Sequence, residues 1–348
     1  MMNAGNKDAF LDVKDLKVHF KVRQGGGLFG VTKYVKAVDG VSFFLKAGET
    51  LGVVGESGCG KSSLARAILG LAEAQAGEVV WTGQNLLGLS AREWQLIRPD
   101  IQMIFQDPLA SLDPRMPIGK IIAEPLKTHR PHLSRKEVNQ EVEKMMERVG
   151  LLPNLINRYP HEFSGGQCQR IGIARALILR PKLLICDEPV SALDVSIQAQ
   201  VVNLLKEIQH EMGLAILFIA HDLAIVRHIS DRLMVMYLGN VVEMGDCEEI
   251  YSSPTHPYTR ALMTAVPIPD PRKERHKEIE LLPGDLPSPI DLPSGCVFRT
   301  RCPLADDHCA EVKPELVGHH QHQVACLKTK APASVSTLST IARGHVSH

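Results

Sequence analysis

The sequence predicts an α/β protein whose core is a largely parallel β-sheet. Three short apolar runs, "TLGVVG", "LLICDEP" and "AILFIAHD", have the composition of strands that are buried on both faces. Segments with helical periodicity lie between them, and strands that alternate with helices favour a parallel sheet. The first run leads directly into a glycine-rich loop and a predicted helix, which is the usual setting of a phosphate-binding site.

The N-terminal part of the chain predicts β-strands. Residues 11–22 and 34–54 are rich in β-branched and apolar residues, and "RQGGG" between them predicts a hairpin loop. The second stretch ends in "TLGVVG", and a helix is expected to begin in "GKSSLARAILGLA".

Two later segments predict long helices. For residues 134–149, Ser134 and Glu137 form a capping box, and Gly150 suits the position just past the end. Each helix has one apolar stripe. The stripe of the first is Val138, Val142, Met145 and Val149, and that of the second (196–213) is Ile197, Val201, Leu204, Leu205, Ile208 and Met212.

Composition shifts along the chain suggest how it is divided. Residues 86–163 look mostly helical, which predicts a subdomain inserted into a main domain of residues 8–255. Prolines become dense after residue 255, as in "VPIPDP" and "LPGDLPSPIDLP", which indicates a linker into a small C-terminal module ending near residue 327. The polar residues 328–348 are expected to be disordered.

Charge and hydropathy exclude several classes of protein. Basic and acidic residues both number 39 among the 348 residues, so no electrostatic footprint for nucleic acid is expected. The opening "MMNAGNKDAF" has no signal-peptide pattern, and apolar runs such as "LAILFIA" are too short to span a bilayer. We therefore expect the chain to be cytosolic, or peripheral on the cytoplasmic face of a membrane, where thiols stay reduced.

The segment "GESGCGKSS" matches the pattern of a P-loop, directly after a strand and before a helix. Glycines allow backbone N–H groups to surround phosphate oxygens, and the helix N-terminus adds partial positive charge. Lys61 is expected to reach the β- and γ-phosphates, and Ser62 to bind Mg²⁺. The predicted nucleotide-binding residues of this loop are Gly55, Glu56, Ser57, Gly58, Cys59, Gly60, Lys61, Ser62 and Ser63.

Two carboxylates follow the second buried strand. Asp187 stands at the strand end, where a carboxylate holds Mg²⁺, and Glu188 is placed to act as the general base on the attacking water. An Asp–Glu pair also opens ordinary helices, where the helix dipole stabilises it. A P-loop upstream favours the catalytic interpretation.

A third motif, "FSGGQCQR" (163–170), places a serine and two glycines at another helix N-terminus. With the P-loop before it and the Asp–Glu pair after it, the chain resembles the ATP-binding subunits of ABC transporters, whose signature is Leu-Ser-Gly-Gly-Gln. Phe163 replaces the leucine, and the matching residues are Ser164, Gly165, Gly166 and Gln167. The resemblance implies a P-loop NTPase domain of the ABC type, with an antiparallel β subdomain, the inserted helical subdomain, and a small cysteine-rich C-terminal extension.

The resemblance also assigns roles to five other residues. Gln106 in "MIFQDP" matches the Q-loop glutamine, which approaches Mg²⁺ and contacts the membrane partner. Ser191 and Asp194 in "SALD" match the D-loop, and His221 in "FIAHD" matches the switch histidine that contacts the γ-phosphate. Phe20 in "KVHF" falls where the family places an aromatic ring that stacks on adenine, although a strand phenylalanine is otherwise simply core.

For the mechanism, the resemblance implies two ATPase domains that meet head to tail and sandwich ATP between the P-loop of one and the signature of the other. One chain carries one set of motifs, so a second ATPase subunit, favoured to be a paralogue, is expected. The other implied partners are two transmembrane permease subunits and a solute-binding protein, with no nucleic acid. ATP binding and hydrolysis would then switch the pair between two states.

The C-terminal region points to one branch of this family. "YSSPTHPYTRALMTAVP", "LPGDLPSP" and "GCVFRTRCPLADDHC" look like the extension of oligopeptide/dipeptide importer ATPases. The resemblance implies import of di- or oligopeptides, and leaves nickel or another small solute as an alternative. A soluble ABC ATPase of DNA repair or translation is disfavoured, because the sequence shows no long heptad run and only one cassette.

Four cysteines stand in the small C-terminal module: Cys296, Cys302, Cys309 and Cys326. Modules of this size usually need a covalent or metal cross-link, and disulfides are not expected in the cytosol. From the residues alone, structural zinc, an iron–sulfur cluster and no metal at all remain open. Zinc ligand pairs usually lie two to four residues apart, which these do not, and four thiolates suit an iron–sulfur cluster equally well. The resemblance favours a [4Fe–4S] cluster on these four thiolates. The other four cysteines show no shared spacing.

Overall fold

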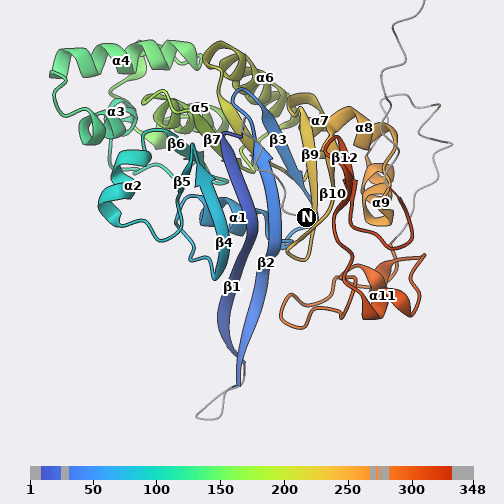
Figure 1. Cartoon of the computed structure of the whole chain (residues 1–348). Helices are drawn as coiled ribbons and strands as arrows, with labels where there is room; N and C mark the ends of the chain where they lie inside the picture. The colour runs from blue at the N-terminus through green and yellow to red at the C-terminus, as the bar shows by residue number, and fades with distance from the viewer. Residues whose placement is uncertain (1–8, 25–30, 267–271, 273–274, 276–281, 331–348) are drawn as a thin grey trace, which may run out of the picture.

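Two β-sheets organise the chain in the computed structural model (Figure 1). The structure describes residues 9–24, 31–266, 272, 275 and 282–330. A four-stranded antiparallel sheet has the order β2-β1-β4-β5, and an eight-stranded mixed sheet has the order β11-β12-β10-β9-β3-β8-β7-β6. In the larger sheet, β9, β3, β8, β7 and β6 run parallel to one another, so the predicted α/β class is confirmed.

The strands have the following bounds. They are β1 (Leu11–Gln24), β2 (Val31–Leu45), β3 (Thr50–Val54), β4 (Ala76–Trp81), β5 (Gln84–Asn85), β6 (Ile101–Ile104), β7 (Leu183–Asp187), β8 (Ala215–Ile219), β9 (Arg232–Tyr237), β10 (Asn240–Asp246), β11 (Val317–His319) and β12 (His322–Val324).

The α-helices among the described residues are α1 (Lys61–Ile68), α2 (Ala91–Ile97), α3 (Ile118–His129), α4 (Arg135–Arg148), α5 (Gly165–Leu177), α6 (Val195–Met212), α7 (Leu223–Ile229), α8 (Cys247–Ser252), α9 (Pro257–Ala265) and α11 (His308–Glu311). Short 3₁₀ turns occur at η1 (Pro153–Leu155), η2 (Pro160–Glu162) and η3 (Arg299–Arg301). None of the helices in this described part combines the length and apolar character needed to cross a membrane.

Strand β8 shows how the sheet divides the core. Successive side chains of a strand point to opposite faces. Ile216 and Phe218 enter the core shared with α5, α6 and α7, whereas Leu217 and Ile219 enter the core shared with α1 and the antiparallel sheet. All five residues of β8 are buried, as they are in β3 and β7. The apolar runs read from the sequence are therefore the centre of a layered core.

Helix ends follow the capping signals of the sequence. Ser134 caps α4 through a complete capping box with Glu137, and Gly150 just beyond the helix has a left-handed φ of +74°. The predicted stripe of this helix is buried. In α6, Gly213 adopts a left-handed φ of +61° at the C-cap. Of its predicted stripe, Ile197 and Met212 are partly buried and the other four residues are buried. Both helix predictions are confirmed.

The N-terminal strands form the expected hairpin. β1 pairs antiparallel with β2 up to Gln24 opposite Val31. The predicted loop itself lies mostly outside the described residues. β1 also pairs with β4, and the long β1–β2 hairpin extends away from α3 and α4 (Figure 1).

The segment predicted as an inserted helical subdomain is more mixed than expected. It contains α2, α3 and α4, but residues Ile101–Ile104 within it form β6, which pairs in parallel with β7 at the edge of the main sheet. A four-residue strand among helical segments is too short to give a clear periodic signal. Its pairing partner also lies about eighty residues away in sequence, so no local pattern indicates the pairing. The helices of this range cluster on the opposite side of the molecule from the C-terminal segment (Figure 1).

The C-terminal extension is packed against the main domain and contributes to its sheet. β12 pairs antiparallel with β10, so the last strands of the chain extend the eight-stranded sheet. Residues expected to be linker form α9, whose Tyr258 is fully buried. Glu243 of β10 is also fully buried, and it accepts hydrogen bonds from the backbone N–H of His256 (2.9 Å) and from His322 Nε2 of β12 (2.7 Å). The tail expected to be disordered spans residues 328–348, and residues 331–348 of it lie outside the described part of the chain.

Candidate active site

The functional motifs meet at one edge of the main sheet. The phosphate-binding loop (residues 55–63) follows β3, His221 follows β8, Asp187 ends β7, and Gln106 follows β6. These four strands are parallel neighbours in the order β3-β8-β7-β6. Their carboxyl ends therefore share one edge, which is where open α/β sheets bind ligands.

The phosphate-binding loop is closely packed at its base and open at its tip. A Cβ on Gly60 would lie 1.9 Å from the carbonyl oxygen of Ala37, and its φ is +107°, so only glycine fits there. Ser57 and Gly58 are exposed, whereas Lys61 is buried and its Nζ donates to the Gly55 carbonyl at 2.8 Å. This conformation leaves the backbone of the tip accessible to an anion, next to a buried cation and the N-terminus of α1.

Ser62 and Asp187 form a site suited to Mg²⁺. Ser62 Oγ donates to Asp187 Oδ1 at 2.8 Å. Burial raises the pKa of the Asp187 carboxyl, the hydrogen bond from Ser62 opposes this, and the charge of Glu188 adds to the rise. The charges of Arg66 and Lys61 act in the opposite direction, as a bound cation would. Within the described ranges no group of three or more His, Cys, Asp or Glu side chains could hold a metal ion. Mg²⁺ on a nucleotide needs only one or two protein ligands, because phosphates and water supply the rest.

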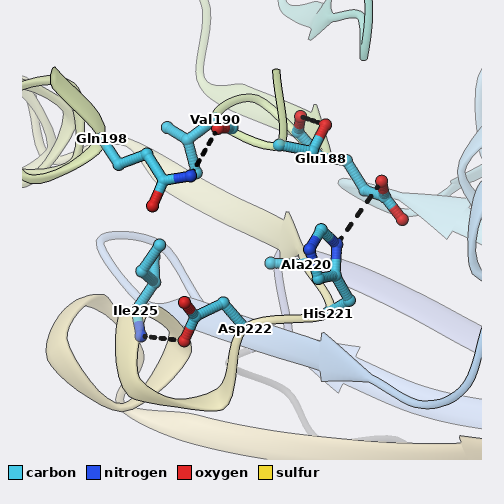
Figure 2. A pocket seen from close by; sticks show the side chains of 8 residues that line it. Glu188, Val190, Gln198, Ala220, His221, Asp222 and Ile225 are labelled. Carbon is cyan, nitrogen blue, oxygen red and sulfur yellow. Dashed lines mark hydrogen bonds and ion pairs between the residues drawn. The ribbon is translucent and has the colours of Figure 1, made fainter. Parts of the chain in front are cut away.

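Glu188 lies between two other residues predicted for the site, Gln106 and His221. Its carboxylate accepts a hydrogen bond from Gln106 Nε2 at 2.9 Å, and Oε2 lies 3.7 Å from His221 Nδ1. Figure 2 shows His221 pointing toward Glu188 across a small cavity of about 30 Å³, which is large enough for a water molecule.

The backbone of Glu188 is unusual. Its φ is +48°, a left-handed value that is uncommon for residues other than glycine, and its N–H donates to the carbonyl of Ile219 at 2.9 Å. Ser191 Oγ donates to the Glu188 carbonyl at 3.1 Å. Backbone in such regions persists where the surrounding structure fixes it, often at functional sites.

The signature motif (residues 164–167) caps α5. Ser164 Oγ accepts from the Gln167 N–H at 3.3 Å, and Gln167 Oε1 accepts from the Ser164 N–H at 3.0 Å. A Cβ on Gly166 would lie 2.5 Å from Ile197 of α6, so the motif packs closely on the helix that follows the D-loop. Ser164 and Gly165 are exposed, as is Asp194 at the N-cap of α6. This helix N-terminus is open to a ligand from outside the chain.

The adenine-stacking residue predicted from the sequence is less well supported by its surroundings. Phe20 lies on β1 opposite Val35 and is 41% exposed. An exposed ring could stack on a base, but its packing alone does not distinguish this role from an ordinary strand position.

The four cysteines of the C-terminal extension are free thiols close to one another. The N–H of Cys296 donates to the Cys309 carbonyl at 2.8 Å. Burial, together with the charges of the three other cysteines, raises the pKa of the Cys296 thiol to about 11. Burial likewise raises the pKa of Cys302. In the described part of the chain, these thiols are not arranged as a group that could hold a single metal ion.

Two residues at the phosphate-binding loop were not predicted from the sequence. Tyr258 Oη accepts a hydrogen bond from the Glu56 N–H at 2.8 Å, and Arg301 Nη1 donates to both Glu56 carboxylate oxygens at 2.8 and 3.1 Å. Both residues belong to the C-terminal extension. The motifs that contain these two residues indicated a family resemblance but not this contact. A contact between residues about two hundred positions apart leaves no periodic pattern in the sequence.

Comparison with known proteins gives consistent matches. Residues 38–191 match the family described as ABC transporter, and residues 242–309 match the region described as oligopeptide/dipeptide transporter, C-terminal region. The chain is 67% identical to the oligopeptide transport ATP-binding protein OppF of Salmonella typhimurium, over 92% of this chain and 97% of the relative. It is 49% identical to the di/tripeptide transport ATP-binding protein DppF of Pseudomonas aeruginosa, over 92% and 97%.

A solved structure shares the fold. The dimeric ATP-binding cassette MJ0796 in a post-hydrolysis state, bound to ADP and Pi, superposes with a TM-score of 0.61. It is 26% identical and covers 68% of this chain and 98% of its own.

Proposed function

The chain belongs to the ABC transporter family, and from this premise we propose that it is the ATP-hydrolysing subunit that drives import of di- and oligopeptides across a membrane. The observation that carries the ATPase function is the gathering of the phosphate-binding loop, Asp187, Glu188 and His221 at one sheet edge. The peptide cargo rests on high identity to relatives named for oligopeptide and di/tripeptide transport, including the matching C-terminal region.

The geometry supports a division of labour at the ATP site. The loop backbone and Lys61 bind the phosphates, and Ser62 with Asp187 would hold Mg²⁺, which would supply positive charge to the bound nucleotide. Glu188 accepts the proton of the attacking water as general base. Gln106 and His221 orient the Glu188 carboxylate toward the cavity beside it.

The exposed signature implies a second ATPase subunit. Ser164 and Gly165 face away from the chain, so they are available to the ATP of a facing subunit. We take the partner to be a paralogue, and the assembly to include two transmembrane permeases and a solute-binding protein. The chain itself would then sit as a peripheral subunit on the cytoplasmic face of the membrane. In this arrangement the main domain (residues 8–255, with helices of 86–163) forms the ATPase, and residues 256–327 form the family's C-terminal extension.

The cargo can be tested in the complete transporter. ATPase activity of the complex in lipid vesicles should rise when its binding protein is added with peptides of two to five residues. Nickel ions with the same binding protein should leave the rate unchanged. Stimulation by nickel and not by peptides would replace the peptide assignment with the metal alternative.

We further propose that Cys296, Cys302, Cys309 and Cys326 hold a [4Fe–4S] cluster. The support is the closeness of the four residues, their free thiols, and the match of four cysteine thiolates to the ligand set of such a cluster. Protein purified without oxygen should carry about four irons and four labile sulfides per chain, and Cys302→Ser should lower both. Stoichiometric zinc without iron would contradict the cluster.

A further inference from the structure

Among the described residues, the hydrogen bonds from the C-terminal extension to the phosphate-binding loop go to Glu56. Tyr258 of α9 accepts from its backbone N–H, and Arg301 of η3 donates to both oxygens of its carboxylate. Lys61 Nζ lies 3.2 Å from the Glu56 carbonyl on the other side. The backbone and side chain of one loop residue are thus held by two groups from a segment about two hundred residues away.

A buried aromatic cluster fixes the position of these two groups. Tyr237 at the end of β9 contacts Tyr258 and Phe298 edge-on, with ring centroids 4.8 and 5.2 Å away. Tyr258 and Phe298 also contact each other at 5.4 Å, and all three side chains are fully buried. Since β9 pairs with β3, which leads into the loop, the cluster joins the extension rigidly to the loop.

Arg301 is held by the turn on which it lies. Its N–H donates to the Phe298 carbonyl at 3.0 Å, and the N–H of Arg299 donates to the Cys296 carbonyl at 3.1 Å. Cys302 follows immediately, so two of the four cysteines bracket this turn. The Arg301 side chain is only 10% exposed, against 28% for Glu56. A guanidinium this enclosed is positioned before any ligand arrives.

The charge of Glu56 makes this contact relevant to ATP. A carboxylate inside a loop that binds a polyphosphate repels its ligand, since like charges a few ångströms apart interact strongly in a partly buried setting. Arg301 Nη1 donates to both oxygens of that carboxylate, so the pair is charge-assisted and the guanidinium neutralises Glu56. Tyr258 holds the backbone of the same residue, and so orients the start of the loop.

We propose that Arg301 and Tyr258 are positioning residues of the ATP site, through which the C-terminal extension sets the affinity for ATP. This inference rests on the proposed ATPase function and deepens it. Neither residue contacts the nucleotide: Arg301 cancels the charge of Glu56, and Tyr258 fixes its backbone. The extension then contributes to the ATP site in addition to packing against the edge of the sheet.

A double-mutant cycle that removes the charges of Arg301 and Glu56, singly and together, tests the role of Arg301 in the full chain. Titration calorimetry with MgATP should show binding roughly tenfold weaker for Arg301→Ala. Glu56→Gln should bind roughly twofold tighter than the wild type, because it leaves Arg301 positive beside the loop. The double variant should return to within about threefold of the wild type, since neither charge remains. Arg301→Lys should lose less than Arg301→Ala, because it keeps the charge.

The controls separate positioning from general damage. Arg299→Ala removes the same charge from the same turn but not from Glu56, and should bind ATP like the wild type. Tyr258→Phe keeps the ring and loses the acceptor, and should raise KM for ATP more than it lowers kcat. If Arg301→Ala does not fold, Arg301→Gln with and without Glu56→Gln carries the same comparison.

The outcomes distinguish this inference from the proposed function. A wild-type chain that does not bind MgATP would overturn the ATPase function itself. A wild type that binds, with Arg301→Ala equally tight or with a double variant as weak as Arg301→Ala, would overturn the charge compensation alone.

Discussion

At the scale of single residues, Asp187 is a binding-site carboxylate whose burial lowers the stability of the folded protein when no cation is bound. The carboxylate is 3% exposed, and burial raises its pKa above the ordinary value of 3.8. The folded state therefore disfavours the charged form that predominates at neutral pH. The resulting penalty is absent below about pH 3.8, where the unfolded chain is also protonated, and is complete above the raised folded pKa. A bound cation would relieve it.

Replacing Asp187 with Asn should therefore stabilise the nucleotide-free protein. The amide keeps the shape and can still accept from Ser62, but it carries no buried charge. We expect the melting temperature without ligand to rise by roughly 2–4 °C at pH 7. The additional stabilisation by MgATP should be lost, because the Mg²⁺ ligand is gone.

Thermal melting with and without MgATP checks this prediction. Asp285→Asn, which neutralises an exposed carboxylate, is the matched control and should change neither melting temperature. An Asp187→Asn protein that melts below the wild type without ligand would show that burial does not penalise this carboxylate.

Glu188 illustrates a different residue-scale effect. Its left-handed backbone was not foreseen from the motif, although its position after Asp187 was. The conformation lets the N–H bond to Ile219 of β8 while the carboxylate meets Gln106 and His221. The backbone places the side chain between two other strand ends.

At the scale of elements, α9 depends on one buried histidine. His256 is 1% exposed and caps the helix, with Nδ1 accepting from the Tyr258 N–H at 3.1 Å. Burial lowers its pKa to about 4, with the charge of Glu243 opposing the shift and that of Arg260 adding to it. The cap works only with neutral imidazole, because a protonated Nδ1 cannot accept.

This cap predicts a loss of stability in mild acid. Between pH 6.5 and about 4 the unfolded histidine binds a proton that the folded one does not, so stability falls as the pH falls through this window. At pH 5 the cost is about 2 kcal/mol relative to pH 7. His256→Asn keeps a capping oxygen and cannot titrate. The unfolding free energy of this variant should depend less steeply on pH, by the equivalent of about one bound proton in this range.

Denaturant unfolding at several pH values between 5 and 7.5 measures that slope. His210→Asn on the exposed side of α6 is the control, and should leave the slope as in the wild type. An unchanged slope in His256→Asn would show that His256 is not the source of the pH dependence.

The hairpin β11–β12 shows how an element can be decided by remote contacts. Each strand has three residues, too few for a recognisable alternation. What fixes β12 is the open edge of β10 together with the buried Glu243–His322 contact at 2.7 Å. A buried carboxylate held by three donors ties β10, α9 and β12 together.

At the scale of the whole molecule, one chain holds only half of each predicted ATP site. The phosphate-binding loop and the signature lie on different parts of the fold, and the signature faces outward. A solved relative of this fold is a dimer. A site completed by a second subunit makes nucleotide binding and association one linked equilibrium.

That linkage predicts the behaviour of Glu188→Gln. The amide still accepts from Gln106 and keeps the site intact, but it cannot take a proton from water, so turnover should fall by at least about a hundredfold. ATP should then hold this chain and its partner subunit together. Light scattering should show a closed pair with MgATP and separate subunits without it.

Glu207→Gln, an exposed carboxylate on α6, is the control and should hydrolyse ATP like the wild type. Hydrolysis by Glu188→Gln at the wild-type rate would remove Glu188 from the role of general base. Loss of ATP binding in this variant would instead indicate a damaged site.

The sequence by itself determined the α/β class, the buried strands, the capped helices and the motifs of the ATP site. It could do so because these depend on local patterns: apolar runs, periodicity, capping residues, and glycines next to a lysine. Parallel strands also bring their carboxyl ends to one edge, so the meeting of Asp187, Glu188 and His221 with the loop followed from their positions after strands.

Only the tertiary structure decided the place of the C-terminal extension. It places β12 between β10 and β11 in the ATPase sheet, turns an expected linker into α9, and brings Tyr258 and Arg301 to Glu56. These contacts join residues far apart in the chain and depend on the shape of surfaces that form on folding. No spacing or composition records them, because a side chain meets its remote partner only when the whole core is assembled.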